Sequence, residues 1–242
     1  MWLQKTKVLA LIGALLFTNV SFATLEQGII AANEGRFEDA LKEFRYLADM
    51  GYAPGIYELA KMYEGGFGVT KNERKAAELF KQAVDLNLAD AMFSLAVMYK
   101  DGRGVKQDLQ KAVELFTSAA NKDLPAAQFN LGVMYTNGEG VIKDYRAALN
   151  WYEKAAGNNF TLAQFNMALM YFQGLGVPES VEKSYIWNLI AEWNGNRDAM
   201  KSRQLDEQKM SPSEVEEANR KANVIYERIL AGTYIAETRP ES

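Results

Sequence analysis

Acidic residues beside paired glycines are the side chains with the clearest potential for chemistry in this sequence. Glu64, Asp101 and Glu139 each lie at such a glycine pair. Two carboxylates can cleave a glycan without histidine or cysteine, one as the acid and the other as base or nucleophile. No nucleophile and base stand together around these acids, so solvated loop charges are the better interpretation. We expect no catalytic site, and a glycan- or peptidoglycan-acting protein is the less favoured alternative.

The composition excludes several other kinds of site. The 242 residues contain no cysteine and no histidine, which rules out disulfides, thiolate nucleophiles and zinc sites of the usual nitrogen and sulfur type. A calcium-loop pattern of alternating acidic residues is also missing from the chain. The net charge of -4 and the lack of a basic cluster argue against a nucleic-acid partner. We therefore expect no metal, no cofactor and no nucleic acid.

The N-terminus has the pattern of a secretory signal peptide. Lys5 and Lys7 precede an apolar run over residues 8–17, and the small residues Ser21 and Ala23 follow it. Ten apolar residues are too few to span a bilayer, which takes roughly 20. The sequence predicts cleavage after Ala23, no membrane span, and a periplasmic or secreted protein.

A period of 36 residues organises most of the remaining chain, which predicts a helical repeat protein. Each unit has two stretches of helical apolar spacing separated by a pair of glycines, which permit a tight reversal. The start of the second helix carries a predicted N-cap in register, and its end carries a residue that tolerates positive φ. The predicted N-caps are Asn72, Asp108, Asp144 and Ser180, and the predicted positive-φ residues are Gly51, Asn87, Asp123, Asn159 and Gly195.

The third repeat shows every position of the recurring pattern. Residues 127–156 read A-x-F-N-L-G-V-M-Y-x-x-G-x-G-V-x-x-D-x-x-x-A-x-x-W-Y-x-x-A-A. This pattern resembles the Sel-one-like repeat (SLR) family, which is related to tetratricopeptide repeats. The resemblance implies an all-α fold, a right-handed superhelical solenoid of stacked antiparallel helix hairpins. It also implies an adaptor or scaffold, since exported bacterial members regulate envelope signalling, assemble envelope machines or meet host proteins.

The period and the resemblance together predict the domain organisation. The first hairpin is tetratricopeptide-like because it lacks the two-glycine loop, and Ser211-Pro-Ser-Glu214 predicts the start of a capping helix. The predicted parts are a signal peptide at 1–23, the first hairpin at 24–52, four 36-residue units at 53–196, capping helices at 197–230 and a flexible tail at 231–242.

In related repeat folds the first helix of each hairpin lines the concave face, which implies a protein-binding groove. The implied binding residues are Tyr57, Lys61, Phe93, Val97, Lys100, Phe129, Asn130, Val133, Phe165, Asn166, Leu169 and Phe172. Aromatic anchors often dominate binding energy, but the same row could instead pack between hairpins. The two asparagines could hold a peptide backbone, or they could bond locally to their own helix.

These observations together predict a non-enzymatic adaptor that holds a segment of an envelope or host protein, mainly by apolar contacts. We expect a monomer, with a weak dimer as the alternative. A structural subunit of an envelope machine, such as a motor or export complex, is the main alternative function. Direct glycan or lipid binding would need an exposed aromatic platform. Trp151 and Trp187 share a column on the second helix, where core packing is the better interpretation.

Overall fold

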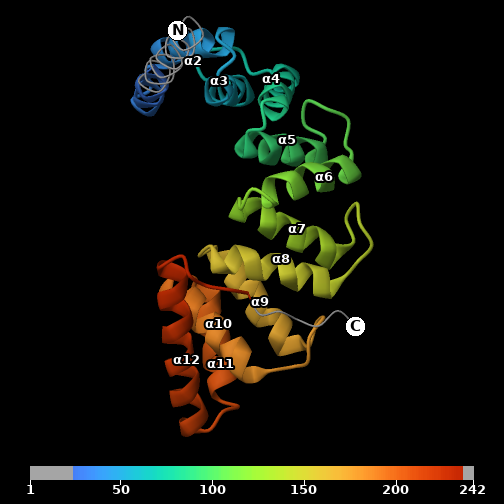
Figure 1. The fold of residues 1–242 in the computed structure, drawn as a ribbon, viewed down its shortest axis with the longest axis vertical. Helices are drawn as coiled ribbons and strands as arrows, with labels where there is room; N and C mark the ends of the chain where they lie inside the picture. Colours follow the sequence, from blue (N-terminus) through green and yellow to red (C-terminus); the bar gives the residue numbers. More distant parts are fainter. Residues whose placement is uncertain (1–23, 237–242) are drawn as a thin grey trace, which may run out of the picture. The chain divides into compact units, whose positions relative to one another are not determined.

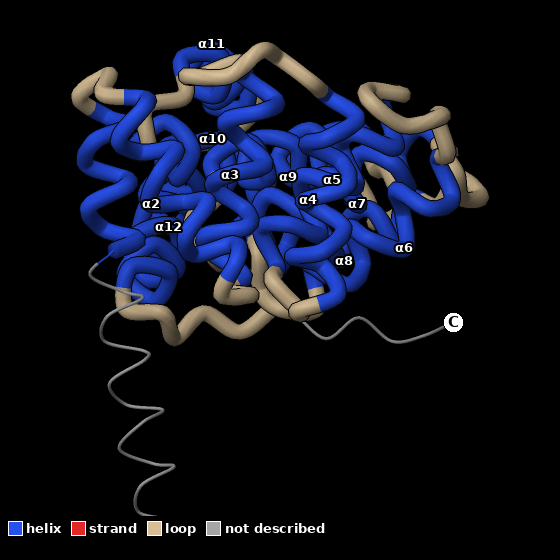
Figure 2. The backbone as a smooth tube through the Cα atoms, turned by 90° about the horizontal axis from the view of Figure 1, so that it is seen from above, coloured by secondary structure: helices blue, strands red, loops and turns tan. Residues whose placement is uncertain are grey.

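The computed structural model describes residues 24–236, and every regular element in this range is an α-helix (Figure 2). This confirms the predicted all-α fold. The predicted signal peptide and residues 237–242 lie outside the described residues. Within residues 24–236, no helix combines the length and the apolar character needed to cross a membrane. The chain divides into two compact units, with the boundary between Asp108 and Leu109.

The first unit is built from short helices joined by tight turns (Figure 1). A helix over residues 24–33 and α2 form the first hairpin around the turn at 34–36, which has no paired glycines. Each following helix packs against the one before it. The named helices are α2 (Phe37–Asp49), α3 (Ala53–Gly65), α4 (Glu73–Asp85) and α5 (Ala89–Asp101).

The second unit continues the same pattern and ends differently. Its helices are α6 (Leu109–Ala120), α7 (Pro125–Asn137), α8 (Tyr145–Gly157), α9 (Thr161–Gln173), α10 (Val181–Trp193), α11 (Arg197–Glu207) and α12 (Pro212–Leu230). Consecutive helices from α6 to α11 pack against each other, and the longer α12 returns to lie along α10 (Figure 1). Ser211 and Glu214 form the predicted capping box at the start of α12.

The predicted caps explain where the second helices begin. The side chains of Asn72, Asp144 and Ser180 each accept a backbone N–H from the first turn that follows. The backbone N–H groups of these residues donate to the carbonyl oxygen of a tyrosine nine residues earlier, at 2.8–3.0 Å. That bond closes the loop between the two helices of a hairpin.

The turns carry the left-handed backbone that the sequence predicts. Asn87, Asp123 and Asn159 have φ near +60°, and they share a column with Gly51 and Gly195. Both glycines of each paired loop also have positive φ. The second glycine has a further constraint, because a Cβ atom at Gly140 would lie 2.5 Å from the carbonyl oxygen of Leu109.

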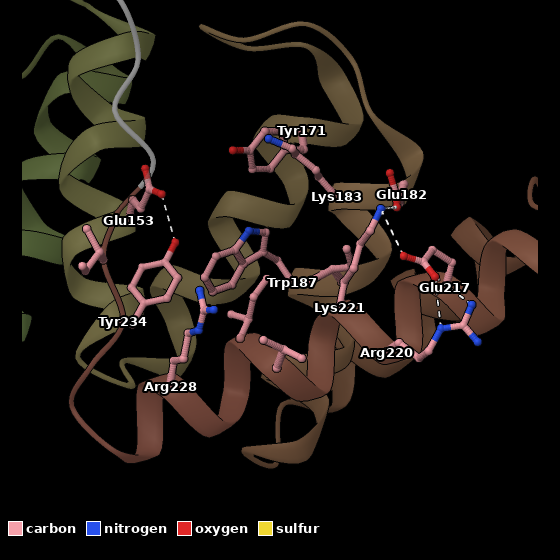
Figure 3. A pocket seen from close by; sticks show the side chains of 14 residues that line it. Glu153, Tyr171, Glu182, Lys183, Trp187, Glu217, Arg220, Lys221, Arg228 and Tyr234 are labelled. Carbon is pink, nitrogen blue, oxygen red and sulfur yellow. Dashed lines mark hydrogen bonds and ion pairs between the residues drawn. The ribbon is translucent and has the colours of Figure 1, made fainter.

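The segment after α12 differs from the flexible tail that the sequence predicts at 231–242. Tyr234 donates its hydroxyl to Glu153 Oε1 at 3.0 Å, and its ring meets Trp187 edge-on with centroids 5.9 Å apart (Figure 3). Glu153 is only 2% exposed, so this bond helps to satisfy a buried carboxylate. The first part of the predicted tail is therefore packed onto α8 and α10.

We expect Gly140→Ala to lower the free energy of unfolding by about 2–5 kcal/mol, because it adds a backbone clash to the strain of a positive φ. Gly195→Ala is the matched control. Its φ is also positive, but nothing lies within 4 Å of the added carbon, so about 1–2 kcal/mol is expected there. Urea unfolding followed by circular dichroism measures both losses. Equal losses would show that the close approach to Leu109 contributes nothing.

Candidate functional site

The predicted binding residues of the first unit are largely engaged within the unit. The ring of Tyr57 lies 5.6 Å from that of Phe80 on α4, and Lys61 forms an ion pair with Glu58 at 2.9 Å. Burial raises the pKa of the Tyr57 hydroxyl, which fits a ring held against the neighbouring helix. The predicted residues on α5 are half-buried: Phe93, Val97 and Lys100.

On α7 the aromatic residue packs inside the second unit. The ring of Phe129 lies between those of Tyr152 and Phe160, with centroid distances of 5.7 Å and 5.2 Å. Val133 also packs against the core of this unit. Of the two interpretations left open by the sequence, this geometry favours packing for Phe129.

The two asparagines have partners within the protein. Asn130 Nδ2 donates to the carbonyl oxygen of Ala126 at 2.8 Å, which is the local helix bond that the sequence left as an alternative. Asn166 hydrogen bonds with the hydroxyl of Tyr152, and burial raises the pKa of that hydroxyl. Neither geometry favours a clamp on the backbone of a bound peptide.

Helix α9 presents an apolar stripe. Leu162 is 52% exposed and Leu169 is 44% exposed, while Phe165 and Phe172 on the same helix are half-buried. Steps of three, four and three residues place all four side chains on one face of a helix. Leu205 on α11 is exposed as well, at 58%. The sequence analysis predicts Phe165, Leu169 and Phe172 for a binding face, and Leu162 and Leu205 are not among its predicted residues.

A pocket of about 140 Å³ opens beside this stripe, between α9, α10 and α11. Its apolar walls include Phe165, Leu169, Phe172 and Leu205. Its buried polar wall is formed by Ser184 and Asn188 of α10 and Asp206 of α11, which are at most 2% exposed, and Gln173 and Ser202 also line the pocket. Apolar walls with a few buried polar groups are typical of a ligand site.

The buried polar wall is a hydrogen-bonded network with one acceptor left without a partner. Asp206 Oδ2 accepts from Ser184 Oγ at 2.8 Å and from Asn188 Nδ2 at 2.9 Å. Both bonds use the same carboxylate oxygen. Asn188 Oδ1 is buried and has no hydrogen-bond partner within residues 24–236. Burial raises the pKa of Asp206, against the two hydrogen bonds and the charge of Lys209.

The repeat columns show how the sequence could have revealed these residues. The period of 36 places the three polar residues in columns that are buried and apolar elsewhere. Ser184 follows Ala40, Ala76, Ala112 and Ala148; Asn188 follows Phe44, Phe80, Phe116 and Tyr152; Asp206 follows Met62, Met98, Met134 and Met170. Three columns that are apolar in the earlier repeats therefore become polar on the neighbouring helices α10 and α11.

A larger pocket, of about 560 Å³, lies between α10, α12 and the segment that carries Tyr234 (Figure 3). Several of its charges pair with one another, since Lys221 contacts Glu182 at 2.6 Å and Arg220 contacts Glu217 at 2.7 Å. Arg228 and Lys183 line it as well.

The aromatic residues considered for glycan or lipid binding do not form an exposed platform. Trp187 is 4% exposed and belongs to the core of the second unit. Trp151 is half-buried, and Lys154 Nζ lies 4.3 Å from its ring centroid. This geometry favours the core-packing interpretation for Trp187.

The acids beside the glycine turns are engaged at their loops. Glu64 accepts from Arg103 at 2.8 Å, and Asp101 lies 3.7 Å from the same guanidinium. Glu139 accepts from the side chain of Asn137 at 2.8 Å. In the part of the chain that the structure describes, no group of three acidic side chains gathers as a metal site would require. These contacts agree with the interpretation as loop charges.

The raised pKa of Asp206 predicts a pH-dependent stability. The folded state holds this proton more tightly than the unfolded state, whose carboxyl has an ordinary pKa of about 3.9. The free energy of unfolding of the native chain should therefore fall, relative to Asp206→Asn, as the pH rises through the folded pKa. Urea unfolding of both proteins from acidic to neutral pH tests this. A difference that stays flat or grows with pH would contradict the assignment.

Comparison with known proteins agrees with this architecture. Residues 53–88, 89–124, 125–160 and 161–187 match the Sel1 repeat family. A protective antigen of uropathogenic Escherichia coli strains, which displays an SLR fold, is 29% identical with a TM-score of 0.75. The alignment covers 92% of this chain and 50% of the antigen. A Sel1 repeat protein from Oxalobacter formigenes is 22% identical with a TM-score of 0.73, over 87% of this chain and 86% of that protein.

A further relative is similar over a short stretch. The exopolysaccharide production negative regulator of Rhizobium meliloti (strain 1021) is 34% identical over 59 residues, which are 24% of this chain and 22% of the regulator. This chain thus spans half of the Escherichia coli antigen and about a fifth of the regulator. The four consecutive matches cover more than half of the residues, and the chain belongs to the Sel1 repeat family.

Proposed function

We propose that this chain is a non-enzymatic adaptor that binds a segment of another protein along α9 and α11 of its second unit. The observation that carries the proposal is the apolar stripe of Leu162, Phe165, Leu169 and Phe172, which continues to an exposed Leu205. Contiguous exposed apolar surface is typical of an interaction site. Sel1 repeats are typically protein–protein interaction scaffolds, which supports the same role.

The proposed location is the periplasm or the cell exterior, and it rests on the signal-peptide pattern of residues 1–23. A role in regulating the envelope is supported by the similarity to a rhizobial regulator of exopolysaccharide production. A protective antigen with the same fold is compatible with a partner outside the cell. In each case the partner that we propose is a protein.

Processing provides a direct test of the location. The mature protein should begin at Thr24, because Ser21 and Ala23 place small residues at the positions that a signal peptidase reads. Mass spectrometry of the protein from the native host gives its N-terminus, and cell fractionation gives its compartment. Ala23→Asp should block the cleavage, whereas Thr24→Ser should leave it intact. An intact N-terminus in the cytoplasmic fraction would reject export.

Site-specific crosslinking in the native host tests the binding face. A photo-crosslinking residue at Leu169 should capture one discrete protein, because this position is exposed within the apolar stripe. Val224 on α12 is the matched control, since it is 48% exposed against 44% for Leu169. Phe129 is less suitable because its ring packs between two others.

A second variant links the capture to the stripe itself. The double change Leu162→Ser and Leu169→Ser should lower capture from a crosslinker at Leu205 by about tenfold or more, because hydrophobic anchors are removed. Thermal unfolding should change little, since both leucines are exposed. Equal capture from Leu169 and Val224, or capture from Leu205 that the serine variant leaves unchanged, would reject this face as the binding site.

A further inference from the structure

The pocket on α9–α11 is the space left by an aromatic ring that the other repeats possess. Tyr57 and Phe129 pack against the rings of Phe80 and Tyr152, which belong to the following helix. Phe165 is the equivalent residue on α9, and the position facing it holds Asn188. The smaller side chain leaves about 140 Å³ next to Phe165. The last repeat thus has a cavity at the position where the other repeats have a pair of packed rings.

The polar wall of this cavity lacks donors of positive charge. Asn188 Oδ1 has no partner among the described residues, and both donors to Asp206 are neutral side chains on the same oxygen. A buried carboxylate is costly unless a cation or several donors compensate it. Such an arrangement in a pocket is characteristic of a functional site rather than of a stabilising core.

No cation of the described residues forms a hydrogen bond or ion pair with the polar wall, although the charge of Lys209 acts on Asp206. Arg203 of α11 donates to Glu192 at 2.6 Å and to Glu207 at 2.7 Å. Lys209 Nζ lies 4.1 Å from the ring centroid of Phe172, outside the residues that line the pocket. Its position shows that the aromatic wall attracts an ammonium group. Asn188 Oδ1 and Asp206 are closed to solvent in this structure, so a cation from outside reaches them only when side chains at the pocket shift.

We propose that this pocket binds the ammonium group of a lysine side chain in the partner protein. The ammonium offers three donors to the Asp206 carboxylate and Asn188 Oδ1, while its methylene stem lies against Phe165, Leu169 and Phe172. Lysine carries its charge as one compact ammonium on an apolar stem, which suits a small pocket of about 140 Å³ with apolar walls better than the planar guanidinium of arginine does. This inference rests on the proposed function, because it specifies the chemistry of the segment held by α9.

A small ammonium ion tests the pocket without knowledge of the partner. The full chain is titrated with n-butylammonium chloride and, separately, with 1-butanol, a neutral molecule of the same length. Nuclear magnetic resonance follows the methyl groups of Leu169 and Leu205. We expect saturable shifts with n-butylammonium and binding at least tenfold weaker with 1-butanol. Similar affinity for both would overturn the proposal, because the pocket would then bind the butyl chain and not the ammonium group.

Variants locate the charge that is recognised. Asp206→Asn keeps the size of the side chain and should weaken n-butylammonium binding by tenfold or more. Asp198→Asn on the same helix is the control, since this carboxylate is 75% exposed and pairs with Lys201. Unchanged binding to Asp206→Asn, or tighter binding of n-propylguanidinium than of n-butylammonium, would overturn the proposal. Binding to Lys209→Gln but not to the native chain would overturn it too, because this chain's own lysine would then be the occupant.

The two proposals can fail separately. If n-butylammonium binds as expected while crosslinking from Leu169 captures no discrete protein, the pocket chemistry stands and the adaptor function fails. If a discrete protein is captured while n-butylammonium fails to bind, the adaptor stands and the lysine pocket is rejected.

Discussion

The packing of neighbouring hairpins in each of the two compact units depends on a contact that only glycine permits. The second glycine of each paired loop lies against the first turn of the second helix in the preceding repeat, as Gly104 does at Glu73 and Gly140 at Leu109. The glycine lies directly against backbone atoms, so the distance between the two segments cannot be adjusted by moving a side chain. Neighbouring hairpins within a unit are therefore held at one spacing. The alanine, aromatic and methionine columns of the repeats are buried in the resulting core.

Because the columns are fixed in space, a change of residue type in one column has a local and interpretable effect. An aromatic ring in the second helix fills the space beside the aromatic residue of the first, as Tyr152 does for Phe129. When Asn188 stands in that column, the scaffold does not collapse to fill the gap. The polar residues of two other columns lie beside Asn188. Ser184 and Asp206 each hydrogen bond to Asn188, and they also bond to each other.

The elements that the sequence predicts well are those that depend on local interactions. Caps such as Asp144 and turns such as Asn159 need only their own few residues, so their types and spacing are sufficient. Exposure on the first-helix face is less predictable, because the size of the neighbouring residue decides whether a ring is covered. Phe129 is covered by Tyr152 and Phe160, whereas Phe165 borders a cavity. The contact between Tyr234 and Glu153 joins residues 81 positions apart, and no local pattern indicates it.

The position of the pocket separates the number of repeats from the residues that line the pocket. The polar residues all belong to the last repeat and to the helix after it, while the same three columns stay apolar in the repeats before them. Whole 36-residue units could therefore be gained or lost upstream during evolution without altering the pocket. In such a lineage the number of repeats would diverge among descendants, while the residues that line the pocket stayed the same.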